Sequence, residues 1–259
     1  MIKTIERLEK LAKYARGSKN LADIGTDHAY LPIFLAANSE VENLLLTDIK
    51  KGPLFRAKHN VGKYYSEMSK FGRRSYADSS SEPIYFDDLF CKFYFRQGDG
   101  LDPIKEGEID TAIIAGMGGE LIVDILSKDI HKTESIGKFI LQPRTKSEGL
   151  RRWIIDNNYK IVAEDLAREK GKICEIIVMS TKKNDSENSI NQLDYLLEQR
   201  NPYLRVFLEQ KIESEKSVLL NLEKSKSKDE DAVNEVNSRA NLASERIEQY
   251  SSYLSKLDA

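Results

Sequence analysis

The chain has 259 residues, of which 40% are hydrophobic and 32% are charged, and its mean hydropathy is −0.51. A membrane-spanning helix needs about 20 consecutive apolar residues, and the apolar runs here are far shorter, so the composition excludes both a membrane protein and a disordered chain. The first residues mix basic and acidic side chains without an apolar block, unlike a secretory signal, so we expect a cytoplasmic protein. The two cysteines and three histidines lack metal-ligand spacing, so we expect neither a disulfide nor a bound metal.

The net charge of −2 conceals an uneven distribution along the chain. Residues 1–183 carry 30 basic and 27 acidic side chains, whereas residues 184–259 carry 10 and 15. Because the length also exceeds that of one average domain, we predict two domains, 1–183 and 184–259. A phosphate-binding surface is expected on the first of them.

Residues 1–15 predict a helix with one apolar stripe and an opposite face that carries Lys3, Arg7 and Lys10. This basic face is either a solvated surface or a phosphate-binding one.

From residue 20 onward, short runs rich in Ile, Val and Leu alternate with helical patterns. The runs predict strands that are buried on both faces, at 21–24, 44–48, 93–97, 111–115 and 139–142. The helices between them are predicted at 31–37, 53–68, 119–126 and 147–157. This alternation is typical of an α/β fold with a doubly wound, mostly parallel sheet.

Two further strand-like runs, 160–166 and 173–180, are joined by a connection that is too short for a helical crossover. They predict an antiparallel hairpin at the edge of the sheet. Residues 68–89 break the alternating pattern and are interpreted as an inserted, mobile surface loop.

The pattern changes after a polar linker at 182–189. Apolar residues recur at heptad spacing over 208–222 and, after a polar stretch at 225–231, again over 233–257. We expect an antiparallel coiled-coil hairpin whose first long helix begins at Asn201-Pro202. The alternative is one long helix that dimerises with a second chain. The polar stretch disfavours it, because it contains no residue to continue the seam, and a monomer is expected.

The strongest local motif, DIGTDHAYLP at 23–32, ends the first predicted strand and opens a helix. Ligands of open parallel sheets bind at this place. Gly25 is the one glycine that matches the GxGxxG dinucleotide fingerprint, and Asp27 would repel a pyrophosphate, so NAD and FAD are disfavoured. A cofactor with a cationic centre and no phosphate meets no such repulsion.

Glycine or aspartate also follows the next predicted strands. Asp48 is either a turn residue or the carboxylate that holds the ribose hydroxyls of an adenosine cofactor. Gly98-Asp99-Gly100 combines a tight turn with a carboxylate that can accept a hydrogen bond from an adenine amino group, and GMGG at 116–119 lets backbone approach a ligand. Four such strand ends in succession favour a binding site over a series of simple turns.

Together with Gly52-Pro53 and ILQP at 140–143, these motifs resemble the bacterial tRNA (adenine-22-N1)-methyltransferase family over the whole chain. The resemblance implies a Rossmann-like class I methyltransferase that uses S-adenosylmethionine to methylate N1 of adenine 22 in the tRNA D arm, with a coiled-coil domain that helps to engage tRNA. It assigns catalysis to Asp27. It implies that the cofactor is bound by Asp23, Gly25, Thr26, His28, Asp48, Ile49, Gly98, Asp99, Gly100, Ala115, Gly116 and Met117. The family commonly has asparagine at the position of Arg144.

The chemistry can also be argued from the acceptor. Adenine N1 has an in-plane lone pair that can attack a sulfonium methyl directly, so positioning supplies most of the catalysis. A carboxylate beside the exocyclic amine would stabilise the positive charge that develops on the ring and could accept a proton. Asp27 either has this role or caps the following helix. Tyr30 either stacks on the target base or packs in the fold, and a base-paired target must first be exposed.

We nominate seven basic residues for contacts with tRNA phosphates: Lys3, Arg7, Lys10, Arg144, Lys146, Arg151 and Arg152. Arg151 and Arg152 are equally consistent with an ordinary helix surface. The cofactor motifs do not define the acceptor. The alternatives are therefore a methyltransferase for a small molecule or a protein, and a non-catalytic scaffold that binds RNA but not S-adenosylmethionine.

Overall fold

The computed structural model describes residues 6–38, 41–69, 75–76, 85–86, 91–182, 189–224 and 230–258. The chain divides into two compact units, Met1–Ile190 and Asn191–Ala259. None of the helices in the described ranges is long and apolar enough to cross a membrane.

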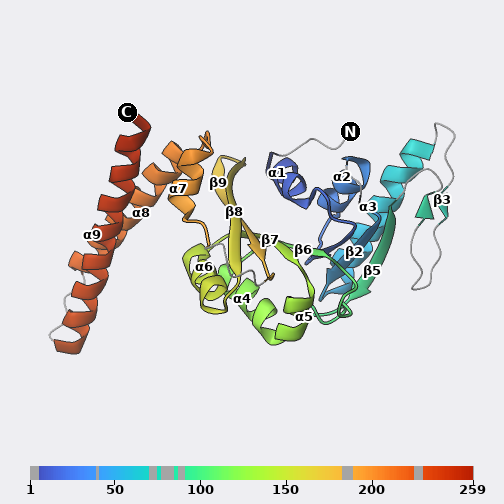
Figure 1. Cartoon of the computed structure of the whole chain (residues 1–259), viewed down its shortest axis with the longest axis horizontal. Helices are drawn as coiled ribbons and strands as arrows, with labels where there is room; N and C mark the ends of the chain where they lie inside the picture. The colour runs from blue at the N-terminus through green and yellow to red at the C-terminus, as the bar shows by residue number, and fades with distance from the viewer. Residues whose placement is uncertain are drawn as a thin grey trace. The chain divides into compact units, whose positions relative to one another are not determined.

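The first unit is built on a seven-stranded sheet with the order β5-β2-β1-β6-β7-β9-β8 (Figure 1). Its strands are β1 (Asn20–Ile24), β2 (Asn43–Asp48), β5 (Lys92–Gln97), β6 (Thr111–Met117), β7 (Lys138–Pro143), β8 (Lys160–Glu169) and β9 (Lys172–Ser180). The first five are parallel, and β9 is antiparallel to both β7 and β8. The predicted Rossmann-like sheet with an antiparallel edge hairpin is confirmed.

Helices cover both faces of this sheet, which explains why the central strands are apolar on both sides. One layer contains α1 (Glu6–Ala15), α2 (Tyr30–Asn38) and α3 (Lys51–Ser69). The opposite layer contains α4 (Gly119–Lys128), α5 (Ile130–Ser135) and α6 (Ser147–Asp156), as Figure 1 shows. Leu11, Leu35 and Val61 belong to the core of the first layer, and Ile122 and Leu150 belong to that of the second.

The hairpin β8–β9 is longer than predicted. Its strands continue to Glu169 and from Lys172, so the turn consists of Lys170 and Gly171 alone. Both turn residues have positive φ, 49° and 81°, as in the two-residue turns that match the twist of a hairpin. The apolar residues of the sequence stop before the β8–β9 pairing does, because the ends of these two strands extend beyond β7 and are partly exposed.

Some short elements were not predicted. Helix α5 separates α4 from β7, and β3 (Ser75–Tyr76) pairs with β4 (Tyr85–Phe86) within the stretch expected to be a loop. The remainder of that stretch from 70 to 90 lies outside the described residues, as do residues 183–188 of the expected linker and residues 225–229 of the expected turn.

The second unit contains α7 (Gln192–Glu198), which was not predicted, and the long helices α8 (Leu204–Lys224) and α9 (Glu230–Asp258). Arg205 at the start of α8 pairs with Asp258 at the end of α9, so the two helices are antiparallel. The predicted helical hairpin is confirmed, and the alternative of one continuous helix is wrong. Asn201 accepts a hydrogen bond from the Tyr203 amide at 3.0 Å, which places Pro202 in the turn before α8 and not at its first position.

Candidate functional site

The carboxyl ends of the parallel strands meet at one edge of the sheet. The strand order reverses between β1 and β6, because β2 and β5 lie beyond β1 whereas β7 lies beyond β6. Such a reversal is where open α/β sheets bind their ligands. The register pairs Ile24 with Thr47 and Ile114, and Asp48 with Gln97, so the four predicted cofactor-binding segments end side by side at this edge.

Gly25 forms a tight turn directly after β1. The amides of Gly25 and Thr26 donate hydrogen bonds to the carbonyl oxygen of Thr47, at 2.8 and 2.9 Å, which ties this loop to β2. Gly25 has φ of 75°, and a Cβ atom there would lie 2.1 Å from Cε of Met117. A side chain at this position would therefore be strained and would displace Met117, so the turn brings bare backbone to the middle of the edge.

The glycines after β5 and in β6 have further structural reasons. A Cβ atom on Gly98 would lie 2.7 Å from Pro103, and one on Gly100 would lie 2.9 Å from Ile125. Gly116 has φ of 81°, and the guanidinium of Arg144 lies 3.5 Å from the position of its missing Cβ. Close contacts thus favour glycine at positions 98 and 100, and the positive φ favours it at position 116.

The two carboxylates predicted to bind the nucleoside lie at the ends of β2 and β5. Asp48 accepts a hydrogen bond from the Lys50 amide through Oδ1 at 2.7 Å. Asp99 is exposed and pairs through Oδ2 with Nζ of Lys128 at 2.9 Å, and the same lysine contacts Asp102 at 2.7 Å. In each case the described contacts involve one oxygen of the carboxylate.

Asp23 is the buried acid of the site. Burial raises the pKa of its carboxyl to about 6, against the opposing effects of Thr26 and of the positive charge of Arg7. Arg7 on α1 contacts two strands of the sheet, with Nη1 3.3 Å from Oε1 of Gln142 on β7 and Nε 3.1 Å from Oε2 of Glu169 on β8.

Asp27 is exposed beside the Gly25 turn and has a cationic partner from another element. Arg56 on α3 contacts Oδ1 through Nη2 and through Nε at 3.1 Å, and Nε2 of His28 lies 3.2 Å from Oδ2. The His28 ring stacks on that of Tyr30, with centroids 5.4 Å apart, and Tyr30 is about half exposed. Both Asp27 oxygens are thus engaged by side chains, and the described hydrogen bonds of Asp27 include none from a backbone amide of α2. Arg56 was not among the predicted site residues, since no local pattern relates it to a loop 29 positions away.

The basic residues nominated for tRNA separate into two groups. Lys10 pairs with Asp165 at 2.7 Å and Arg151 pairs with Glu164 and Glu175 at 2.7 and 2.9 Å, so these cations, like Arg7, are engaged inside the unit. The exposed group consists of Arg144, Lys146 and Arg152, of which Lys146 lies 3.8 Å from Oε1 of Glu120, which is exposed as well. Lys3 lies outside the described residues.

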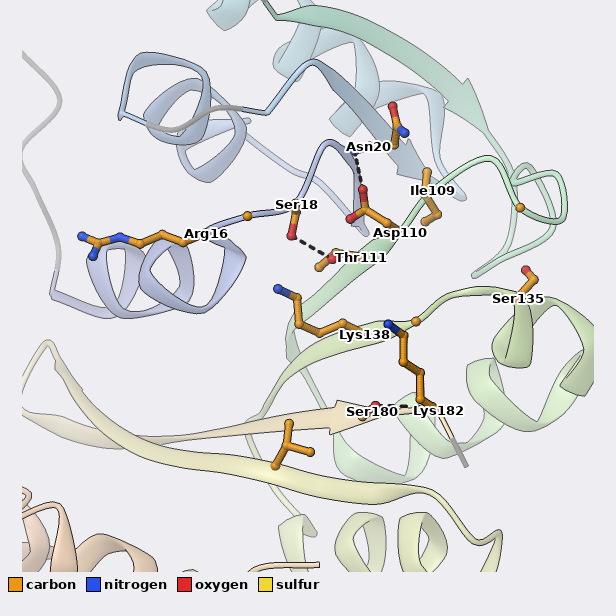
Figure 2. Close-up of a pocket in the computed structure, with 14 residues that line it drawn as sticks. Arg16, Ser18, Asn20, Ile109, Asp110, Thr111, Ser135, Lys138, Ser180 and Lys182 are labelled. Atoms are coloured by element: carbon orange, nitrogen blue, oxygen red, sulfur yellow. Dashed lines mark hydrogen bonds between the residues drawn. The ribbon is translucent and has the colours of Figure 1, made fainter. Parts of the chain in front are cut away.

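A cavity of about 660 Å³ lies at the opposite, amino-terminal edge of the parallel strands (Figure 2). Its lining includes Ser18, which shares a 2.8 Å hydrogen bond with Thr111, and Asp110, which accepts one from the Asn20 amide at 2.8 Å. These bonds anchor the starts of β1 and β6. None of the predicted site residues lines this cavity, so it is separate from the site at the carboxyl edge.

Comparison with known proteins places this geometry in a family. The model of the tRNA (adenine(22)-N(1))-methyltransferase family matches residues 81–245, and a general methyltransferase domain model matches residues 4–75. The tRNA (adenine(22)-N(1))-methyltransferase of Bacillus subtilis (strain 168) is 33% identical over 185 residues, which are 71% of this chain and 68% of that protein.

Solved structures agree with these sequence matches. The crystal structure of the B. subtilis m1A22 tRNA methyltransferase matches with a TM-score of 0.74 and 26% identity, over 98% of this chain and 100% of that one. The M. capricolum enzyme in complex with S-adenosyl-homocysteine, the cofactor product, matches with a TM-score of 0.67 and 26% identity, over 96% and 97%. From the family model and the Bacillus relative, the chain belongs to the tRNA (adenine(22)-N(1))-methyltransferase family.

Proposed function

We propose that this S-adenosylmethionine-dependent enzyme, which methylates N1 of adenine 22 in tRNA, performs the reaction at the carboxyl edge of its parallel strands, with Asp27 beside the target adenine. The observation that supports this most is the position of Asp27. Its exposed carboxylate follows the Gly25 turn at the reversal of strand order, and Arg56 and His28 hold one oxygen each.

The residues at this edge suit S-adenosylmethionine, whose sulfonium centre supplies an electrophilic methyl group. Asp48 would accept hydrogen bonds from the ribose hydroxyls through the oxygen that does not contact Lys50. Asp99 would accept one from the adenine amino group, and the Gly25 turn and Asp23 would hold the methionine part. Segment 115–117 would form one wall. The cluster of carboxylates fits a cofactor with a positive centre and no phosphate.

The enzyme's own groups would then act by orientation and by charge. Tyr30, half exposed on the His28 ring, offers a face on which the target base can stack. The Asp27 carboxylate would lie beside the exocyclic amine, where it stabilises the positive charge that develops on the purine and can accept its proton. Arg56 and His28 would keep the carboxylate oriented during this step.

Replacement of Asp27 by Asn tests the proposal, because it preserves the shape of the side chain and removes its charge. We expect kcat to fall by about 10²- to 10⁴-fold, while the affinity for S-adenosylmethionine in calorimetry changes little. Methyl transfer is followed with labelled cofactor and unmodified tRNA, and the methylated nucleoside is located by mass spectrometry. Asp124→Asn, at an exposed carboxylate on α4, is the matched control. Wild-type turnover in Asp27→Asn would rule out the catalytic role.

The exposed cations Arg144, Lys146 and Arg152 are the proposed phosphate contacts on the first unit. Arg7, Lys10 and Arg151 would have to leave buried or half-buried carboxylate partners to bind phosphate, whereas Glu120, the partner of Lys146, is exposed, so the first three are weaker candidates. We also propose that the helical hairpin of the second unit helps to engage tRNA. A tRNA substrate is consistent with a cytoplasmic enzyme.

A further inference from the structure

One exposed helix face beside Asp27 has no role in the account above. Helix α3 buries Leu54, Ala57, Val61 and Tyr65 against the sheet. Residues three or four positions apart share a face of a helix, and the outward face of α3 presents Lys51, Phe55, Arg56, His59 and Lys63. We call these five residues the α3 face.

The α3 face carries basic residues and no acidic one. From residue 51 to residue 66 the sequence contains four lysines and arginines and no acidic residue. Among the ion pairs of the described part of the chain, none includes Lys51 or Lys63, whereas Arg56 pairs with Asp27. Unpaired cations such as Lys51 and Lys63 attract a polyanion, and they raise the salt dependence of its binding.

An aromatic ring lies within this basic row. Phe55 is 74% exposed, which is more than any other large hydrophobic side chain in the described ranges. A single exposed apolar residue is ordinary on a protein surface. A ring flanked by Lys51 and Arg56, however, has the combination of stacking surface and positive charge with which proteins bind single-stranded nucleic acid.

The α3 face is continuous with the site. Arg56 contacts Asp27, and Nδ2 of Asn60, one turn further along α3, donates a hydrogen bond to the carbonyl oxygen of His28 at 3.1 Å. Phe55 is the neighbour of Arg56 in the same helix. A nucleotide strand whose adenine lies at Asp27 would therefore have its adjoining nucleotides over α3.

We propose that the α3 face binds the tRNA strand adjoining the target adenine, with Phe55 stacked on one unpaired neighbouring base and with Lys51 and Lys63 on phosphates. This inference rests on the proposed placement of the target adenine beside Asp27. It adds to the proposed tRNA surface a helix that contains none of the basic residues nominated from the sequence. It also explains how an extruded adenine could be held outside the RNA duplex, since a neighbouring base stacked on Phe55 resists the return of the adenine to its paired position.

Two pairs of variants test the inference in the full-length protein. Phe55→Ala is compared with Ile155→Ala, which removes a 52% exposed apolar side chain from α6. Lys63→Glu is compared with Lys182→Glu, which makes the same charge change at the cavity on the amino-terminal edge. Each variant is titrated with an unmodified tRNA transcript at several salt concentrations, and S-adenosylmethionine binding is measured separately by calorimetry.

We expect Phe55→Ala to raise the Kd for tRNA about tenfold or more, and Phe55→Tyr, which keeps the ring, to restore the affinity. Lys63→Glu should make the negative slope of log K against log salt shallower by about 0.7 to 0.9. The loss of methylation should appear in KM and not in kcat. Both control variants should bind tRNA like the wild type, and all variants should keep the cofactor affinity.

Wild-type tRNA affinity and salt slope in both Phe55→Ala and Lys63→Glu would overturn the role of the α3 face, and so would equal losses in the control variants. Failure of the catalytic proposal is recognised differently, because it appears as undiminished turnover in Asp27→Asn whatever the α3 variants do to tRNA binding.

Discussion

Asp23, which we propose to hold the cofactor, shows how a buried carboxyl can lower the stability of a fold. Burial raises the pKa of its carboxyl to about 6, from 3.8. Between these values the folded protein keeps a proton that the unfolded chain has lost, so the contribution of Asp23 to stability falls as the pH rises through this range. Above pH 6, the ionised group destabilises the folded state by up to about 3 kcal/mol.

Asp23→Asn removes this ionisable group. We predict that the variant has a larger free energy of unfolding than the wild type at pH 8, by at most about 3 kcal/mol, and that the difference shrinks toward pH 4. Urea denaturation at pH 4, 6 and 8 measures it, with Asp156→Asn at an exposed helix end as the control. A difference that does not vary with pH would contradict the assignment. If Asp23 also holds the cofactor, the stabilised variant should bind S-adenosylmethionine more weakly, a common conflict between stability and function.

Among the elements, the hairpin β8–β9 is held to α6 by one buried cation. Arg151 donates hydrogen bonds to Glu164 on β8 and to Glu175 on β9, and Ser147 at the start of α6 donates one to Glu175 at 2.9 Å. The Glu164 side chain is only 1% exposed. Removing the cation from a buried ion pair destabilises the fold because it leaves an uncompensated charge. This cost is far larger than the stability that the intact pair contributes.

Replacing Arg151 by Met should therefore lower the free energy of unfolding by about 3 to 5 kcal/mol. Its neighbour Arg152 is exposed, and Arg152→Met should change stability by less than about 0.5 kcal/mol. Urea denaturation of both variants provides the comparison. Equal effects at the two positions would mean that the buried ion pairs do not hold the hairpin to the helix.

For the whole molecule, the helical hairpin of the second unit satisfies its own apolar seam. Leu208 and Leu222 of α8 are buried, as are Ala243 and Tyr250 of α9. Arg246 also pairs with Glu215 at 3.2 Å. We therefore predict a monomer, with a mass near 29.6 kDa in sedimentation equilibrium over a wide range of concentration. A species of twice this mass would show that the helices find partners in a second chain.

Much of the fold was predictable because burial leaves local patterns. The strands β1 and β2 are buried on both faces and appear in the sequence as short apolar runs, and the recurring apolar residues of α8 and α9 mark a helix–helix seam. The short elements α5 and α7 and the two-residue turn of the edge hairpin left weaker signals. Their few residues form no complete hydrophobic period.

The same distinction applies to the site. Glycines and aspartates at successive strand ends are a property of the sequence, and parallel strands necessarily bring those ends to one edge. The ion-pair partner of each cation was not predictable, because an outward-facing lysine and a buried one look alike in an amphipathic pattern. Lys10 meets Asp165 from 155 positions away, and Arg56 meets Asp27 across two elements. The sequence by itself therefore determined the main strands and helices and the edge at which the glycines and aspartates gather. Only the tertiary structure decided which charges face each other and which stay exposed, since ion pairs depend on distance in space.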